Sequence, residues 1–387
     1  MAFDRAHAEF LSTRHFPGLD GLRCLSVLLV VAYHVSGLHS GLLGRGYLGV
    51  SLFFAISGFL ITTLLLRERD GHGRISLARF YGRRALRIFP LYYAVIAVYV
   101  VTVLILEKGV QEKAEFFGNL PAFLTYTSNW LVPLVPDKRI IFYFAWSLAT
   151  EEQFYLIWPG VMRVARRWGA PAFMVLLLTV SLVAPWAVET GRLDDGPLWV
   201  RILASFSPAI CLGCLAAYAV HSRVGFAWVY RVLGAQWCAP ALLVLVMAAV
   251  STDGTAFWLT ALVMTALVVA CCLRNDHWLM PLLTLAPVRY VGMISYGIYL
   301  MHMLALNTVR RALPEQGFTV YFLLTMALSV VGAGLSYRYF ESRFLRIKQR
   351  LTLEPKAPAG PVLEKHVQTA VTSRATASGA PASNPVP

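Results

Sequence analysis

Charged residues are scarce in this chain of 387 residues: Asp, Glu, Lys and Arg together make up 14%, and only 20 residues are acidic. Soluble domains carry about 25% charged residues, so the composition excludes an ordinary soluble protein of this size. Hydrophobic residues reach 58%, and apolar runs of about twenty residues, the length of a transmembrane helix, recur along most of the chain. The sequence therefore predicts a polytopic membrane protein.

Motifs of several soluble enzyme classes are also missing. The chain has no Walker loop, dinucleotide-binding glycine motif, H-E-x-x-H or G-x-S-x-G elbow. Six cysteines lie in or beside apolar runs, and the only C-x-x-C spacing, Cys211 to Cys214, has no second pair or histidine cluster. We interpret the cysteines as packing residues and expect no metal. The net charge of +14 is spread between apolar runs, which argues against a nucleic-acid partner.

The apolar runs predict an all-α transmembrane bundle of about ten helices. The expected ranges are 19–39, 47–66, 91–106, 141–162, 171–188, 199–220, 237–252, 256–273, 290–309 and 319–340. An even number of spans places both termini on one side of the membrane. Basic residues concentrate after the second, fourth and tenth ranges, on the side of the N-terminus. The positive-inside rule therefore predicts that both termini are cytoplasmic.

Three parts are expected along the chain. Residues 1–18 form a cytoplasmic N-terminal segment without a cleavable signal peptide, and residues 19–345 form the transmembrane domain. Residues 346–387 form a cytoplasmic tail that is first basic and then disordered, because Ala, Pro, Ser and Thr dominate it without periodicity. One outer connection, about 107–140, is longer than the others and is a candidate cover for a substrate path.

The first helix carries two ionisable residues, Arg23 and His34, inside an apolar segment. Their separation of eleven residues places them about 20° apart around a helix axis and roughly 16 Å apart along it. Ionisable groups at membrane depth usually face a protein interior, and a neutral histidine can act as a general base toward a hydroxyl. A snorkelling arginine with a structural histidine is the alternative.

The run F-Y-G-R-R-A-L-R-I-F-P begins at Phe80 and carries Arg83, Arg84 and Arg87. The spacing puts the three side chains on one broad helix face. Guanidinium groups match phosphate oxygens, so this face suits a polyphosphorylated cytoplasmic ligand. Topological anchoring, with bound anionic membrane lipids, is the alternative.

A third run, A-W-S-L-A-T-E-E-Q-F-Y-L-I-W-P, places Ser147, Glu151 and Glu152 among aromatic residues. Ser147 and Glu151 share a helix face, whereas the adjacent glutamates face different partners. A lipid-facing position is too costly for them, so we expect at least one to pair with a site histidine or an arginine. The run I-S-Y-G-I-Y-L-M-H adds His302, for which a satisfied core histidine is favoured over a second site group.

Five ordered motifs together resemble the membrane-bound acyltransferase-3 family, the ten-helix O-acyltransferases of bacterial cell envelopes. The motifs are L-D-G-L-R followed by ten residues and His34, G-V-S-L-F-F-A-I-S-G-F-L-I, R-R-A-L-R-I-F-P, W-S-L-A-T-E-E-Q-F-Y-L-I-W-P and S-Y-G-I-Y-L-M-H. They span roughly residues 17–345, nearly the whole chain outside the tail.

The resemblance implies a multi-pass protein of the bacterial inner membrane that moves an acyl group, commonly acetyl, from acyl-CoA. The acceptor is a hydroxyl of a surface polysaccharide, lipopolysaccharide, peptidoglycan or related glycolipid. It also implies that His34 and Glu151 are catalytic, with Glu151 orienting His34 or stabilising its charged form. Arg23 and the three arginines of the R-R-A-L-R run would bind acyl-CoA.

A proton-coupled transporter or flippase for an anionic glycolipid is the alternative function. It would use the same intramembrane ionisable groups as a proton path. It gives no reason for the ordered motifs, and the sequence contains no visible inverted repeat.

Overall fold

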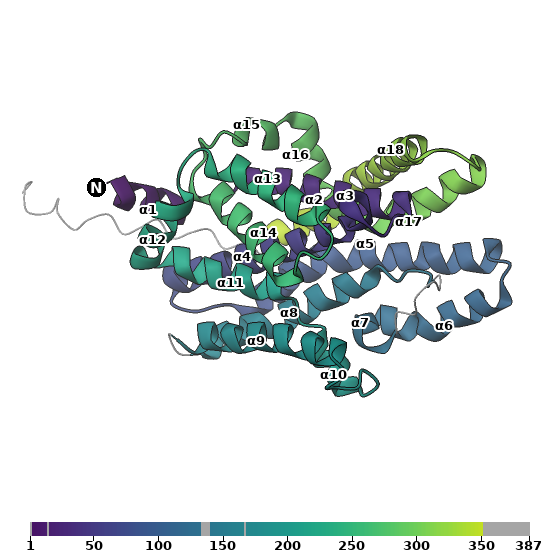
Figure 1. Cartoon of the computed structure of the whole chain (residues 1–387), viewed down its shortest axis with the longest axis horizontal. Coiled ribbons are helices and arrows are strands. Elements are labelled where there is room, and N and C mark those ends of the chain that lie inside the picture. The colour runs from purple at the N-terminus through teal and green to yellow at the C-terminus, as the bar shows by residue number, and fades with distance from the viewer. Residues whose placement is uncertain (1, 14, 133–139, 166–167, 351–387) are drawn as a thin grey trace, which may run out of the picture. The chain divides into compact units, whose positions relative to one another are not determined.

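The computed structural model describes residues 2–13, 15–132, 140–165 and 168–350 (Figure 1). These residues form helices and no strand, which confirms the predicted all-α class. The elements are α1 (Ala2–Ser12), α2 (Pro17–Ser36), α3 (Gly41–Gly44), η1 (Gly46–Leu48), α4 (Gly49–His72), α5 (Leu77–Leu106), α6 (Val110–Leu124), α7 (Ser128–Leu131), α8 (Ala145–Val164), α9 (Gly169–Glu189), α10 (Leu198–Ala204), α11 (Pro208–His221), α12 (Arg223–Leu233), α13 (Cys238–Ser251), α14 (Phe257–Leu273), α15 (Met280–Leu283), α16 (Ala286–Met293), α17 (Ser295–Ala312), α18 (Phe318–Ser336), the π-helical η2 (Tyr337–Glu341) and α19 (Ser342–Arg350).

Among the described residues, five helices are long and apolar enough to cross a membrane, and the number of spans rises to seven if each of two bent helix pairs counts as one span. Each of the ten expected ranges contains a helix, whereas the count of ten spans and the side of the termini stay predictions. The continuous helix predicted over 199–220 is wrong, because the structure breaks it into α10 and α11 with a bend of 47°. Pro208 begins α11 and cannot donate the backbone hydrogen bond that would join the two helices.

The arginine-rich stretch between the second and third expected ranges is mostly helical. α4 continues to His72, and α5 begins at Leu77 instead of residue 91. The turn between them includes Gly73, whose φ of 70° is the left-handed conformation that ends many helices. The mean hydropathy of the sequence falls in this arginine-rich stretch, but α4 and α5 both extend into it as helices.

The long connection predicted over 107–140 also differs from an open loop. It contains α6 and α7, and residues 133–139 lie outside the described residues. Asn129 of α7 donates to Thr150 at 3.2 Å and to Gln153 at 2.9 Å, both on α8. These bonds fix the connection to α8, so the predicted cover is a packed helical element.

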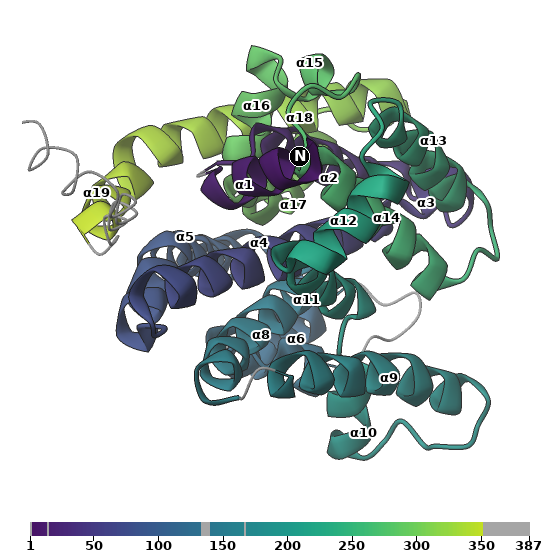
Figure 2. The ribbon, with the colours of Figure 1, turned by 90° about the vertical axis from the view of Figure 1, so that its left-hand side faces the viewer.

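The predicted termini fall partly inside the folded body. α1 contacts α12 and α14, and its Phe10 is buried (Figure 2). The start of the predicted tail, residues 346–350, belongs to α19. The disordered part expected from residue 355 onward lies outside the described residues.

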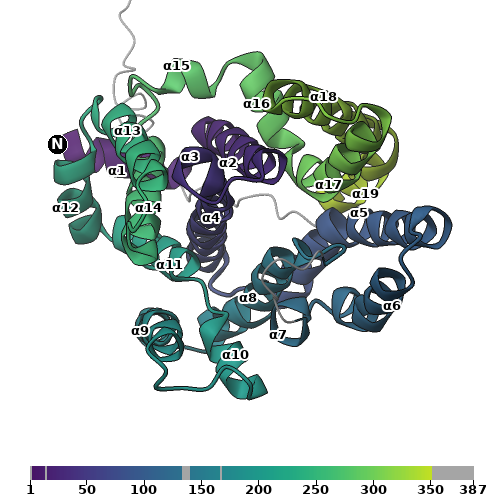
Figure 3. The same cartoon turned by 45° about the vertical axis from the view of Figure 1, so that its right-hand side comes forward.

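Helices α2 and α4 lie at the centre of the bundle, with α11 and α14 on one side and α8 on another (Figure 3). α11 approaches α4 closely at two glycines. A Cβ on Gly58 would collide with the carbonyl oxygen of Ile210, and one on Gly213 would lie 2.5 Å from that of Ala55. Small residues at such positions let helix backbones meet in a membrane protein.

Replacing Gly58 with alanine is expected to lower the stability of the protein. The added methyl group meets backbone, which cannot rotate away, and overpacking of this kind typically costs about 1–3 kcal/mol. Thermal unfolding in detergent would measure the change. Gly160→Ala in α8 is the control, because a Cβ added there would have no neighbour within 4 Å. Equal melting temperatures for the two variants would contradict the close approach.

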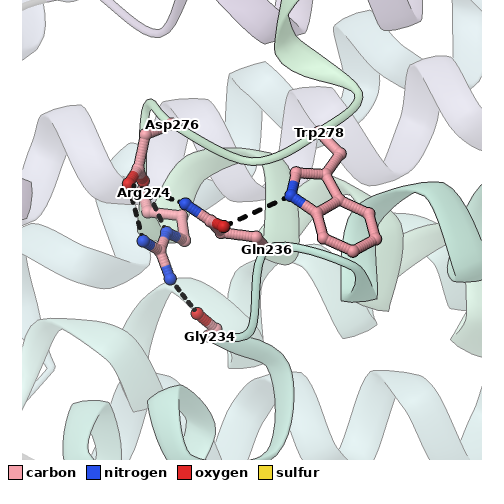
Figure 4. A network of polar contacts seen from close by, with 5 residues as sticks. All are labelled: Gly234, Gln236, Arg274, Asp276 and Trp278. Atoms are coloured by element: carbon pink, nitrogen blue, oxygen red, sulfur yellow. Dashed lines mark hydrogen bonds and ion pairs between the residues drawn. The ribbon is translucent and has the colours of Figure 1, made fainter.

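A polar network outside the spans joins the α12–α13 connection to the segment after α14 (Figure 4). Arg274 pairs with both oxygens of Asp276 and donates to the carbonyl of Gly234 at 2.8 Å. Gln236 donates to Asp276 and accepts from the indole of Trp278, each at 3.2 Å. The hydrogen bond from Arg274 lowers the pKa of Asp276 to about 2. The carboxylate therefore stays ionised, and the network intact, at physiological pH.

Candidate functional site

A cavity of about 510 Å³ lies among α2, α4, α5, α8 and α17 and is also bounded by η2 and α19. This volume falls in the range of small-molecule and cofactor sites. Its polar lining residues are His15, Asp20, Arg23, Ser57, Glu68, Arg83, Arg84, Arg87, Ser147, Glu151, Glu152, Tyr155, Ser295, Tyr296, Tyr299, Tyr337 and Lys348.

Seven of the nine site residues expected from the sequence line this cavity. They are Arg23, Arg83, Arg84, Arg87, Ser147, Glu151 and Glu152. His34 and His302 do not line it, although they lie close to one of its walls. The structure thus brings together candidate residues from three separate sequence motifs.

Two of the cationic side chains are held by acidic neighbours. Arg23 donates to Asp20 at 3.0 Å, and His15 lies 3.2 Å from the other oxygen of that carboxylate. Arg83 pairs with Glu68 at 3.3 Å. These pairs lie at the end of the bundle where α2 and α5 begin and α4 ends. Their charges are partly compensated within the protein.

Arg84 and Arg87 differ from the other two arginines. Within the described ranges, no hydrogen bond or ion pair joins either guanidinium to a carboxylate. Arg84 instead lies over the ring of Tyr155, 3.8 Å from its centroid. Stacking fixes the plane of a guanidinium while leaving its N–H donors free to bind an anion. Both side chains reach the cavity, so this end can accept a phosphate group.

Glu151 lies further along the cavity and is bonded differently from the expectation. Its carboxylate accepts hydrogen bonds from the hydroxyl groups of Ser57 on α4 and Tyr155 on α8. No hydrogen bond or ion pair joins it to His34, both of which the structure describes, so a role of Glu151 toward this histidine stays a prediction. Both hydroxyl groups bond to Oε1 of Glu151, which fixes this carboxylate between α4 and α8.

The far end of the cavity is closed by Ser147 of α8 and Tyr299 of α17. Their hydroxyl oxygens are 2.5 Å apart, and the hydroxyl of Tyr299 also donates to the carbonyl of Phe144 at 3.0 Å. Both side chains are buried. This hydrogen-bonded pair, the Ser147–Tyr299 pair, forms the boundary between the cavity and the two histidines.

His34 and His302 lie beyond that boundary with their ring centroids 4.9 Å apart. Nδ1 of His34 bonds to the carbonyl of Val30 at 2.9 Å, and Nδ1 of His302 bonds to that of Tyr299 at 2.5 Å. A carbonyl accepts, so each Nδ1 carries the hydrogen and each Nε2 is left with a lone pair. Nε2 of His302 is buried and has no partner among the described residues. The arrangement provides two unprotonated ring nitrogens close together.

Sequence reasoning missed ten of the polar lining residues, among them Ser57, Tyr155, Tyr299 and Lys348. Helical spacing could have found Tyr155, which lies four residues after Glu151, and Tyr299, which lies three before His302. Ser57 lies in the run G-V-S-L-F-F-A-I-S-G-F-L-I, from which we drew no candidate site residue. Lys348 lies in the basic stretch assigned to the tail, where nothing marks it out from its neighbours.

The described residues hold no group of three or more His, Cys, Asp or Glu side chains that could bind a metal ion. The acidic residues of the cavity instead face hydroxyl groups and arginines. The site therefore offers anion binding at one end and hydroxyl and imidazole groups at the other.

Comparison with known proteins identifies several relatives. A protein of Staphylococcus aureus (strain COL), provisionally named an O-acetyltransferase, is 26% identical over 383 residues, covering 88% of this chain and 59% of that protein. YrhL of Bacillus subtilis (strain 168), provisionally named a peptidoglycan O-acetyltransferase, is 28% identical, with 85% and 54% covered. The peptidoglycan O-acetyltransferase OatA of Listeria monocytogenes is 26% identical, with 86% and 56% covered.

The chain spans a little over half the length of these relatives. No solved structure matches it. The acyltransferase-3 family model, described as an acyltransferase domain, matches residues 16–338, which include every residue of the cavity except His15 and Lys348. On this match over most of its length, the chain belongs to the acyltransferase-3 family.

Proposed function

We propose that this protein transfers an acetyl group from acetyl-CoA to a hydroxyl group of a cell-envelope glycan of the peptidoglycan class. The single observation that carries the proposal is the cavity, which has phosphate-binding arginines at one end and the Ser147–Tyr299 pair at the other. Family membership supports acyl transfer, and the names of the relatives support a peptidoglycan acceptor.

The donor binds, in this proposal, with its phosphates at the arginine end. Arg84 and Arg87 supply the guanidinium groups that no carboxylate of the described residues occupies, and Arg23 and Arg83 add positive charge from their paired positions. The pantetheine arm is narrow and uncharged, so it can extend past Phe53 and Phe54 toward Ser147. This orientation brings the thioester to the boundary at Tyr299.

In this proposal the Ser147–Tyr299 hydrogen bond opens when both substrates are bound, so that the acceptor hydroxyl, approaching from the other side, meets both His34 and the thioester. Nε2 of His34 takes the hydroxyl proton while the oxygen attacks the acyl carbonyl. The new ester bond forms as the carbon–sulfur bond breaks, and the coenzyme A thiolate leaves and is then protonated. Glu151 acts indirectly, because it fixes Ser57 and Tyr155 and, through Tyr155, the plane of Arg84.

The orientation follows from the positive-inside rule, which places the arginine end on the cytoplasmic side of the bacterial inner membrane. Acyl-CoA is a cytoplasmic metabolite, so this orientation presents the donor end to its supply. The histidine end then faces outward, toward the glycan.

Expression of the chain in a bacterial strain that lacks O-acetylated envelope glycans tests the proposal. We expect alkali-labile acetyl esters to appear on the glycan fraction, measured by release of acetate after mild base treatment. Unchanged ester content with altered distribution of a glycolipid across the membrane would instead support a transporter and contradict the proposal.

A further inference from the structure

The last described helix, α19, forms part of the wall of the cavity. α18 continues through η2 into α19, and α19 packs against α5, the helix that carries the arginine face (Figure 2). The family match ends at residue 338, so α19 lies outside the matched region. α19 therefore adds to the cavity wall a segment that the family motifs do not include.

Lys348 is the residue of α19 that reaches the cavity. It lines the same space as Arg83, Arg84 and Arg87 and is half-buried there. Arg343 and Arg346, on the same helix, are exposed and do not line the cavity. Of these three cations, Lys348 thus faces the donor end, while Arg343 and Arg346 lie on the surface.

We propose that Lys348 is a fifth cationic ligand for the phosphates of the acyl-CoA donor, so that α19 belongs to the donor site. This inference depends on the proposed function, because it assigns Lys348 to the donor of that reaction. Two of the four cavity arginines are held by Asp20 and Glu68, so a polyphosphate needs positive charge beyond Arg84 and Arg87. An ammonium on a flexible stem can follow a phosphate as a point charge.

Calorimetric binding of coenzyme A to the full chain in detergent tests the inference. Lys348→Gln is expected to weaken binding about 10-fold, the effect of losing one charge-assisted contact, and Lys348→Arg is expected to retain most of the affinity. Arg346→Gln is the matched control, because it removes the same charge from an exposed position of the same helix. Its affinity is expected to equal that of the unaltered protein.

The outcomes separate the inference from the proposed function. If the unaltered protein does not bind coenzyme A, the proposed donor is wrong. If it binds, but Lys348→Gln binds equally well, the assignment of Lys348 is wrong and the proposed donor stands. Equal weakening by Lys348→Gln and Arg346→Gln would also overturn the assignment, because it would show a general charge effect. A melting temperature of Lys348→Gln close to that of the unaltered protein establishes that the variant is folded.

Discussion

Replacing His34 with glutamine removes acyl transfer while the protein still enters the membrane and binds coenzyme A. Loss of a general base typically lowers a rate by about 10²- to 10⁴-fold, and we expect a loss within this range. Transfer of labelled acetyl from acetyl-CoA to soluble glycan fragments measures the rate. Coenzyme A affinity, measured on the same preparation, separates a chemical defect from a binding defect.

The physical reason is the hydrogen bond that fixes the imidazole of His34. Nδ1 donates to the carbonyl of Val30, so Nε2 carries the lone pair that can accept a proton. A glutamine places its amide near the position of Nε2 but has no basic nitrogen. The variant therefore tests the chemistry with little change in packing.

His39→Gln is the control for this prediction. His39 follows α2 and is exposed, so the same substitution there is expected to leave the rate unchanged. A His34→Gln protein with the normal transfer rate would remove His34 from the mechanism. Equal losses in the two variants would point to an effect on the end of α2 rather than on proton transfer.

Replacing Arg84 and Arg87 together with glutamine is expected to weaken coenzyme A binding by about 100-fold, because two charge-assisted contacts are lost. Arg83 is left unaltered in this variant, since it is already paired with Glu68. Removal of Arg83 would also leave a carboxylate unpaired and confuse binding with stability. Affinity for coenzyme A in detergent is the direct measurement.

The control is the double variant Arg74→Gln and Arg79→Gln. Both arginines are exposed and lie near the same end of α5, outside the cavity. Their loss removes equal charge from the same side of the membrane, so it also tests whether topology depends on these charges. Retained affinity in the Arg84 and Arg87 variant would contradict phosphate binding by this face.

The sequence predicted those features of the fold that depend on local patterns. Apolar runs located every long helix, because burial in lipid and helix formation require the same kind of segment. The ends were less accurate: α5 begins fourteen residues before the expected start at residue 91, since its first turns are charged but still helical. The bend between α10 and α11 could not be predicted from the apolar run, because it depends on how the fold accommodates Pro208.

The features of the candidate site also fall into those that local sequence patterns predicted and those that they did not. Helical spacing correctly grouped Arg83, Arg84 and Arg87, because these residues share one helix. The bond between Glu151 and Ser57 joins residues 94 positions apart, and that between Ser147 and Tyr299 joins residues 152 apart. Such pairs depend on how whole helices pack, and no periodicity in one chain contains that information.

An assay of acetyl transfer by the purified chain tests the proposed reaction itself, the transfer of acetyl from acetyl-CoA to a glycan hydroxyl. The protein would be placed in liposomes with acetyl-CoA labelled in the acetyl group and with soluble peptidoglycan fragments, and ester and free thiol would be counted together. We expect labelled, alkali-labile ester to appear on the glycan, in an amount equal to that of the coenzyme A released. Binding of coenzyme A without ester formation or thiol release, in a preparation shown to be folded, would contradict it.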